Sequence, residues 1–169
     1  MENKNAKDFF AAGMGEFALS RFDKSIDLLT RAIEADPSYT LAIVSRGAAF
    51  LKTDMLDRAQ SDFDRAITIN PDYARAYHLR GLVSEKRGDN HTALADFNRA
   101  TELDPEYGAA YYSRAALHAK MANTEKAQGD IEMIAHLGCR NMETFMNENN
   151  VWQTQHMRVE DYLETELER

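Results

Sequence analysis

The chain of 169 residues is poor in helix breakers, with three prolines and eight glycines. It has one cysteine, Cys139, so neither an internal disulfide nor a Cys-x-x-Cys metal site can form within one chain. No apolar run approaches the roughly 18 residues that span a bilayer, and none follows a basic N-terminus. We therefore expect no membrane helix, no secretory signal and a cytoplasmic protein.

An excess of basic residues is also missing. The 20 Lys and Arg residues are outnumbered by 28 Asp and Glu, and the formal net charge is -8. Negative charge disfavours binding to nucleic-acid phosphates and to anionic membrane surfaces, so we expect neither as a partner. Hydrophobic residues make up 44% of the chain, which is enough for a packed core, and the abundance of Ala, Leu, Glu and Arg favours helix.

The three prolines, Pro37, Pro71 and Pro105, stand 34 residues apart. Each belongs to a phrase of one type, for example Asp104-Pro105-Glu106-Tyr107. Proline cannot continue a helix and disfavours helical geometry at the residue before it, so each phrase ends one helix. The period predicts four units, over residues 6–39, 40–73, 74–107 and 108–141.

Each unit has a second, weaker break near its middle, at Ser20-Arg21, Thr53-Asp54, Gly88-Asp89 and Ala122-Asn123. A unit is therefore predicted to be two antiparallel helices of about 14 residues joined by a short turn. One position of every first helix is small, namely Gly13, Gly47, Gly81 and Ala115. Because glycine inside a helix costs about 1 kcal/mol relative to alanine, its recurrence indicates a tight crossing. We expect Gly81 to contact Ala93 and to tolerate replacement by alanine.

In the third unit an aromatic, Gly, Ala, aromatic, Ala, Pro series reads Tyr77, Gly81, Ala93, Phe97, Ala100 and Pro105. With the 34-residue period, this series resembles the tetratricopeptide repeat (TPR) family over residues 6–141. The resemblance implies an all-α fold, a right-handed superhelix of four helix pairs whose first helices line a concave face. It also implies a protein-binding role without catalysis.

Residues 142–169 are expected to form one or two capping helices, because a repeat stack leaves its last apolar face uncovered. Gly138 is interpreted as the signal that ends the preceding helix, with Cys139 in the turn that follows. Asn149-Asn150 is the expected break inside the cap. Beyond it, an acidic segment carries Trp152, Val159, Leu163 and Leu167 along one helical stripe.

The sequence lacks patterns of catalytic, cofactor-binding or metal-ligating residues. Its histidines form no His-Glu-x-x-His pair and stand at His78, His91, His118, His136 and His156. No glycine-rich loop follows a strand, because no strand is predicted. We therefore expect no enzyme activity, no cofactor and no metal.

By family geometry, the concave face is expected to form a groove for a partner. Its predicted lining is Phe10, Met14, Phe17, Leu41, Val44, Leu51, Lys52, Arg75, His78, Leu79, Leu82, Lys86, Tyr112 and Lys120. Most of these residues are apolar, while the three lysines recur every 34 residues along one rim. An apolar trough with a basic edge suits an amphipathic helix or an extended peptide with acidic residues. The alternative for the lysines is an ordinary solubilising role.

Some TPR proteins hold the acidic C-terminal tails of heat-shock chaperones with Lys, Asn and Arg side chains on their inner helices. The matching positions here hold Phe10, Met14, Ser45, Arg75 and Leu79. Only Arg75 could serve, so that ligand is not expected.

Two other functions stay open beside capture of another protein. In one, the acidic C-terminal helix fills its own groove or a neighbour's, giving an autoinhibited monomer or a homo-oligomer. In the other, the protein is a chaperone for secreted proteins.

Charged residues also follow the repeat. An Arg precedes the small residue of the first helix in units two to four, and an Asp precedes the large apolar residue of the second helix. Unit one lacks both and has Ala12 and Leu28 instead. Because the two charges are present or absent together, we predict three ion pairs within units: Arg46–Asp62, Arg80–Asp96 and Arg114–Asp130.

Overall fold

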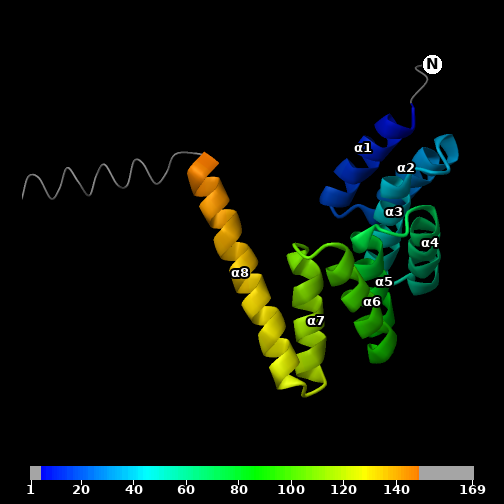
Figure 1. The fold of residues 1–169 in the computed structure, drawn as a ribbon. Coiled ribbons are helices and arrows are strands. Elements are labelled where there is room, and N and C mark those ends of the chain that lie inside the picture. Colours follow the sequence, from blue (N-terminus) through cyan, green and yellow to red (C-terminus); the bar gives the residue numbers. More distant parts are fainter. Residues whose placement is uncertain (1–4, 149–169) are drawn as a thin grey trace, which may run out of the picture.

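The structure is a computed structural model that describes residues 5–148, with side chains described through residue 140. This part of the chain contains eight helices and no strand (Figure 1). The helices are α1 Ala6–Ala18, α2 Phe22–Ala35, α3 Thr40–Lys52, α4 Leu56–Ile69, α5 Ala74–Lys86, α6 Asn90–Leu103, α7 Gly108–Lys120 and α8 Thr124–Glu148.

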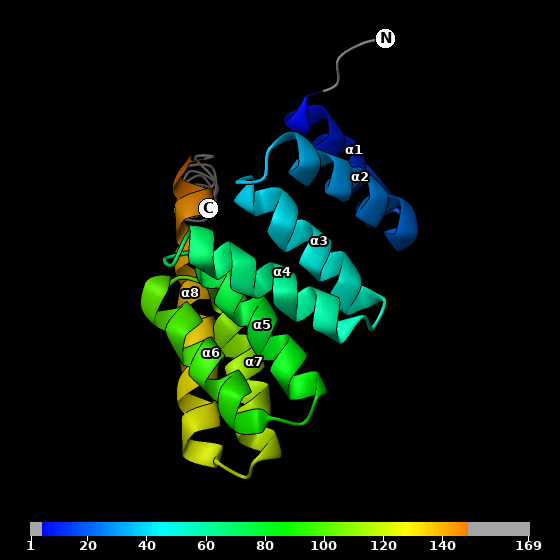
Figure 2. The same cartoon turned by 90° about the vertical axis from the view of Figure 1, so that its right-hand side faces the viewer.

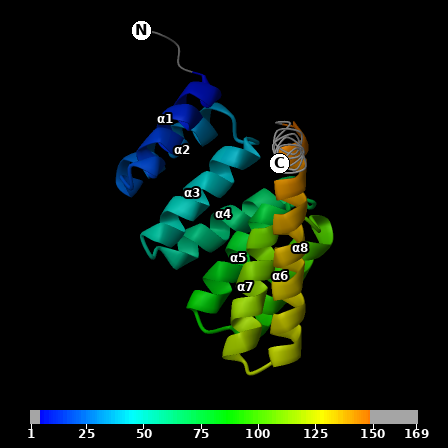
Figure 3. The same ribbon diagram turned by 90° about the vertical axis from the view of Figure 1, so that its left-hand side faces the viewer.

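Consecutive helices pack against each other and build a superhelical stack of pairs. The odd-numbered helices α1, α3, α5 and α7 lie along one face (Figure 3), and α2, α4 and α6 cover the opposite face (Figure 2). The predicted all-α superhelix of helix pairs is therefore confirmed. The first helices of the units form the face on which the groove is predicted.

The helices end where the repeat predicts. Asp36, Asn70 and Asp104 have extended backbones after α2, α4 and α6, and the side chain of each accepts a hydrogen bond from the backbone N–H two residues later. Within the units, one residue of each turn is left-handed, with φ of 57° at Ser20, 63° at Asp54, 82° at Gly88 and 61° at Ala122. The 34-residue period therefore extends to backbone geometry.

The small residues of the first helices allow close packing, and Gly81 contacts the predicted neighbour Ala93 together with a closer one, Phe97. A Cβ built on Gly81 would lie 2.6 Å from the Phe97 ring and 3.2 Å from the Ala93 carbonyl oxygen. Gly47 meets Phe63 in the same way. Phe63 and Phe97 are fully buried. The nearest contact of Gly81 is therefore a buried ring, and this geometry favours the opposite of the expected tolerance to alanine.

All three predicted ion pairs are present. Arg46 donates from Nε and Nη2 to the two carboxylate oxygens of Asp62 at 2.9 and 2.7 Å. Arg80–Asp96 and Arg114–Asp130 repeat this two-pronged geometry. Each Asp side chain is at most 7% exposed. The pairs are thus partly buried at the crossing of the two helices of a unit.

The third guanidinium nitrogen of each arginine makes a bond that the sequence analysis did not predict. This nitrogen, Nη1, donates to a residue on the second helix of the preceding unit. Arg46 donates to Thr30, Arg80 to Asp64 and Arg114 to Asn98. These acceptors stand 34 residues apart and are all polar. Each arginine therefore ties three helices together, within its unit and across the unit boundary.

The end of the stack differs from prediction. Helix α8 runs through Gly138 and Cys139 to Glu148, so Gly138 does not end a helix and Cys139 is not in a turn. The proline that follows α2, α4 and α6 is missing here, and a single glycine costs a helix only about 1 kcal/mol. The expected break at Asn149-Asn150 and the stripe from Trp152 to Leu167 lie outside the described residues.

Candidate functional site

The first helices of units two to four enclose a hollow of about 740 Å³, called here the α3–α5–α7 hollow. Its lining residues are Ala48, Leu51, Lys52, Leu79, Leu82, Glu85, Lys86 and Lys120. Six of the fourteen predicted groove residues are among them. They come from the middle and the C-terminal parts of three neighbouring helices, so the hollow lies towards one edge of the concave face.

Helical spacing explains this lining. Leu79, Leu82 and Lys86 stand three and four residues apart on α5, so they share one face of the helix. On α3, Ala48 and Lys52 occupy the repeat positions of Leu82 and Lys86, and Leu51 lies next to Lys52. Apolar side chains form the floor of the hollow, and a charged residue at the end of each helix stands at its rim. Glu85, which the sequence analysis missed, occupies the repeat position of Leu51, and that register was the available signal.

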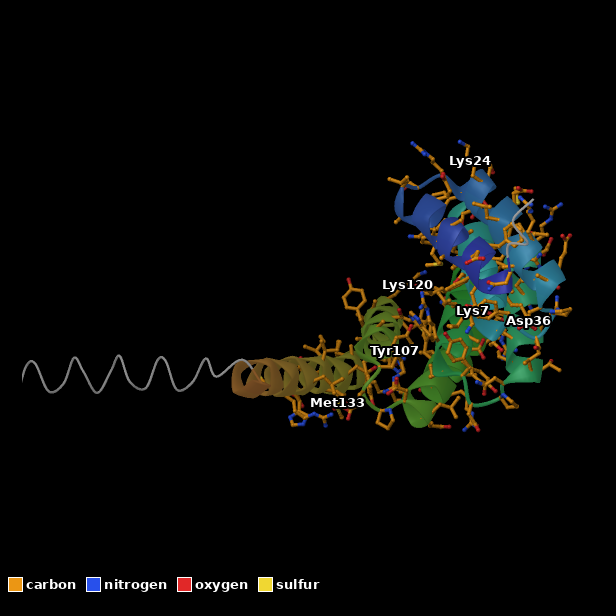
Figure 4. The ribbon with its side chains drawn as sticks, turned by 90° about the horizontal axis from the view of Figure 1, so that it is seen from above. Lys7, Lys24, Asp36, Tyr107, Lys120 and Met133 are labelled. Carbon is orange, nitrogen blue, oxygen red and sulfur yellow. The ribbon has the colours of Figure 1, made fainter. Side chains whose placement is uncertain are left out.

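The rim is basic but not fully neutralised. The Nζ atom of Lys86 lies 2.7 Å from Asp54, and that of Lys120 lies 4.0 Å from Glu85. Both lysine side chains are more than half exposed, and pairs this exposed contribute about 0–1 kcal/mol. Lys52 has no carboxylate partner among the described residues. The cations are therefore available to a ligand at small cost. Figure 4 shows Lys120 on the side of α7 turned towards the earlier units.

Other predicted groove residues lie outside the hollow. Phe10 packs against Tyr39 with tilted rings whose centroids are 5.1 Å apart, and Phe17 packs edge-on against Phe22. Met14 is half-buried in the same helix, α1. The exposed residues outside the hollow are Leu41, Arg75 and Tyr112, in the first two turns of α3, α5 and α7.

Two residues predicted in the groove are instead buried. Val44 is 2% exposed and belongs to the main core cluster. His78, at the same repeat position, is 6% exposed. This position faces the neighbouring helices of the stack, so neither side chain offers surface to a partner.

His78 links the third and fourth units. Its Nδ1 lies 3.0 Å from the Tyr107 hydroxyl and its Nε2 lies 2.9 Å from Ser113 Oγ, so a neutral ring donates one bond and accepts the other. Burial, with a smaller contribution from the positive charge of Arg75, lowers the pKa of His78 from 6.5 to about 4. The ring is therefore neutral at physiological pH. Its Nε2 joins α5 to α7 of the fourth unit, while its Nδ1 bonds Tyr107 at the end of its own unit.

This burial predicts a loss of stability in acid. The unfolded state takes up a proton at the ordinary pKa, so the contribution of neutral His78 is complete above pH 6.5 and is lost as the pH falls towards 4. Between about pH 7.5 and pH 5, the wild type should lose about 1–2 kcal/mol more unfolding free energy than His78→Gln. Urea denaturation at both pH values measures this difference. The exposed-site control His91→Gln should follow the wild type, and identical pH dependence in all three proteins would contradict the prediction.

The described part of the chain meets the requirements of neither a metal site nor a membrane span. Among the side chains described through residue 140, no group of three His, Cys, Asp or Glu is placed to hold a metal ion. No helix in the described part of the chain has the length and apolar character needed to span a bilayer. The hollow is therefore a feature of shape, apolar surface and positive charge.

Comparison with known proteins agrees with this architecture. Two family models described as "Tetratricopeptide repeat" match residues 10–74 and 74–107. The chain belongs to the tetratricopeptide repeat family. These matches extend over the first three helix pairs, and the structure adds the fourth pair, α7 and α8, to the TPR stack. No curated protein matches the chain in sequence.

Solved TPR structures share the fold at low sequence identity. The crystal structure of MamA is 20% identical, with a TM-score of 0.73 over 84% of this chain and 83% of that one. TTC0263, a thermophilic TPR protein of Thermus thermophilus, is 19% identical with a TM-score of 0.71, over 78% of this chain and 74% of that one. The first TPR of Spaghetti (RPAP3), bound to the HSP90 peptide SRMEEVD, is 24% identical with a TM-score of 0.66, over 72% and 97%.

Proposed function

We propose that this TPR protein is a non-catalytic scaffold that binds a segment of another protein in the α3–α5–α7 hollow. The observation that carries the proposal is the combination of an apolar floor and a rim of three lysines in one concavity. Pockets that bind peptides pair apolar surface for anchoring with a few charges that set orientation. The size of the hollow, about 740 Å³, suits several side chains of a partner.

The chemistry of the hollow favours an amphipathic partner with acidic residues. Leu51, Leu79 and Leu82 would contact its apolar side chains, while Lys52 and Lys120 would meet its carboxylates. The lysines stand on different helices, so a helix or extended strand lying across α3, α5 and α7 could reach more than one of them. In this orientation the leucines would anchor the ligand, and the lysines would fix the direction in which it lies.

A chaperone-tail ligand such as the one bound to RPAP3 fits less well. Of the residues at the clamp positions, Ser45 is buried, and Phe10, Met14 and Leu79 are apolar. Arg75 alone is exposed and charged. The proposed partner therefore binds by apolar anchoring beside acidic residues, and not through a terminal carboxylate held by several polar side chains.

Peptides selected from a random display library on the wild type test the proposal. They are expected to be rich in apolar and acidic residues. Their affinity, measured by fluorescence anisotropy, should fall by about tenfold or more in Lys52→Glu/Lys120→Glu, because attraction becomes repulsion at both ends of the rim. The melting temperature should change little, since both lysines are exposed.

A matched control separates local from overall charge. Lys24→Glu/Lys126→Glu changes the net charge equally at exposed positions on α2 and α8, outside the hollow. This control should retain wild-type affinity. Equal losses in both double variants would indicate a general charge effect, and no loss in either would place the ligand elsewhere, so both results would contradict the proposal.

A further inference from the structure

The last helix pair leaves an apolar position open that is closed in every earlier pair. Leu29, Phe63 and Phe97 occupy one repeat position in α2, α4 and α6, and all three are fully buried. At the same position of α8, Ile131 is 51% exposed. In the earlier units the first helix of the next unit also packs against the second helix, whereas no described helix follows α8.

Helix α8 is also much longer than its partner. It has 25 residues, against 13 in α7. Arg140 forms an ion pair with Glu106, just before α7 begins. Because α8 runs antiparallel to α7, residues 141–148 extend past the N-terminal end of α7. The projecting helix is visible in Figures 1 and 4, and the label of Met133 in Figure 4 marks its inner half. Because the helix is continuous, this extension cannot fold back to cover Ile131 of the same chain.

Two pairs of apolar residues stand at equal distances on either side of Gly138 in the sequence of α8. Ile131 and Phe145 stand seven residues to either side of it, and Ile134 and Met142 stand four residues to either side. Steps of four and seven residues return to one face of an α-helix. Gly138 itself has no atom within 4 Å of a Cβ built on it, in contrast to Gly13, Gly47 and Gly81 at the helix crossings. Ile131, Ala135 and Gly138 are all exposed.

We infer that this face is the interface of a symmetric dimer, in which α8 packs antiparallel against α8 of a second copy. Gly138 of the two copies marks the crossing, where the missing side chain lets the helices approach. This register sets Ile131 of each copy opposite position 145 of the other, so each extension covers the position that its own chain leaves open. A two-fold interface requires a self-complementary surface, and the symmetry about Gly138 supplies it. The hollow remains free for its ligand.

Sedimentation velocity of the full chain over a concentration series tests the dimer. The wild type should change from monomer to dimer, and Ile131→Glu should raise the dissociation constant by about 30-fold or more, as expected for a central interface residue. Leu19→Glu, a matched change at a position 61% exposed on the loop after α1, should dimerise like the wild type. Thermal melting should show both variants folded, since both positions are at least half exposed.

The single cysteine gives a second readout of the same geometry. Cys139 is exposed and lies next to Gly138, so a short bismaleimide should join two copies near the two-fold axis. Linkage should fall in Ile131→Glu, persist in Leu19→Glu and disappear in Cys139→Ser. Equal linkage in wild type and Ile131→Glu would overturn the inference.

Exchange of a C-terminal segment into a neighbour's hollow would give a different pattern. In that case Lys52→Glu/Lys120→Glu would lose the dimer and Ile131→Glu would keep it, which overturns the inference. A wild type that stays monomeric at every concentration overturns it as well. If the α8 dimer forms while selected peptides fail to bind the hollow, the proposed function fails and the dimer stands.

Discussion

Replacing Asp62 by leucine is expected to lower the free energy of unfolding by about 3–5 kcal/mol, because it leaves a partly buried guanidinium without its carboxylate. The side chains of Arg46 and Asp62 are 17% and 6% exposed, and two hydrogen bonds join them. Without Asp62, the Thr30 hydroxyl is the one hydrogen-bond acceptor left to Arg46 among the described residues. Urea denaturation followed by circular dichroism measures the loss.

Unit one of the chain shows how the cost can be avoided. It has Ala12 and Leu28 at the positions of Arg46 and Asp62. The double variant Arg46→Ala/Asp62→Leu copies this uncharged pair and should be clearly more stable than the sum of the single changes predicts. Coupling below about 0.5 kcal/mol in this cycle would contradict a strong interaction between the two side chains.

The third unit provides a graded comparison. Asp96 and, to a smaller degree, Asp64 raise the pKa of Arg80, since both accept hydrogen bonds from it. After Asp96→Leu, Arg80 would still have Asp64 at 2.8 Å. The loss should therefore be smaller than that of Asp62→Leu. This ranking of the two losses depends on the bond from Arg80 to Asp64 of the preceding unit. Equal losses would indicate that only the Arg–Asp pair within the unit matters.

The fold was predictable because several different residue types recur with the same 34-residue period. Prolines end the second helices, small residues mark the crossings, and Arg and Asp are present or absent together. The cross-unit acceptors were missed although Thr30, Asp64 and Asn98 share the same spacing. Their three different side-chain types conceal a common role, which is to accept one hydrogen bond.

The groove was predictable only in part. The register places Leu51, Leu82 and the lysines on one face, because helical spacing fixes which residues share a side. It does not say how deeply neighbouring helices cover that side. Val44 and His78 are therefore buried at positions that a single helix would leave open. The length of α8 was missed for a similar reason, since one glycine without a proline is too weak a signal to end a helix.

Gly81→Ala is expected to destabilise the protein by about 1–3 kcal/mol, although alanine is the better helix former. The added methyl group would lie 2.6 and 2.8 Å from two atoms of the Phe97 ring and 3.2 Å from a backbone oxygen. Phe97 is fully buried and has little space to move into, so we expect the two helices to separate. Gly129→Ala, with no atom within 4 Å of the new Cβ, should instead stabilise by about 0.5–1 kcal/mol.

The fourth unit indicates how the clash can be relieved. It combines Ala115 with Ile131, where the third unit combines Gly81 with Phe97. Phe97→Ile alone should cost stability through a cavity, but in Gly81→Ala/Phe97→Ile the methyl group fills part of that space. The double variant should therefore be more stable than the sum of the two single losses by at least about 0.5 kcal/mol in chemical denaturation. Strict additivity would mean that the methyl group and the ring do not compete for the same volume, and that the recurrence of glycine at this position has another cause.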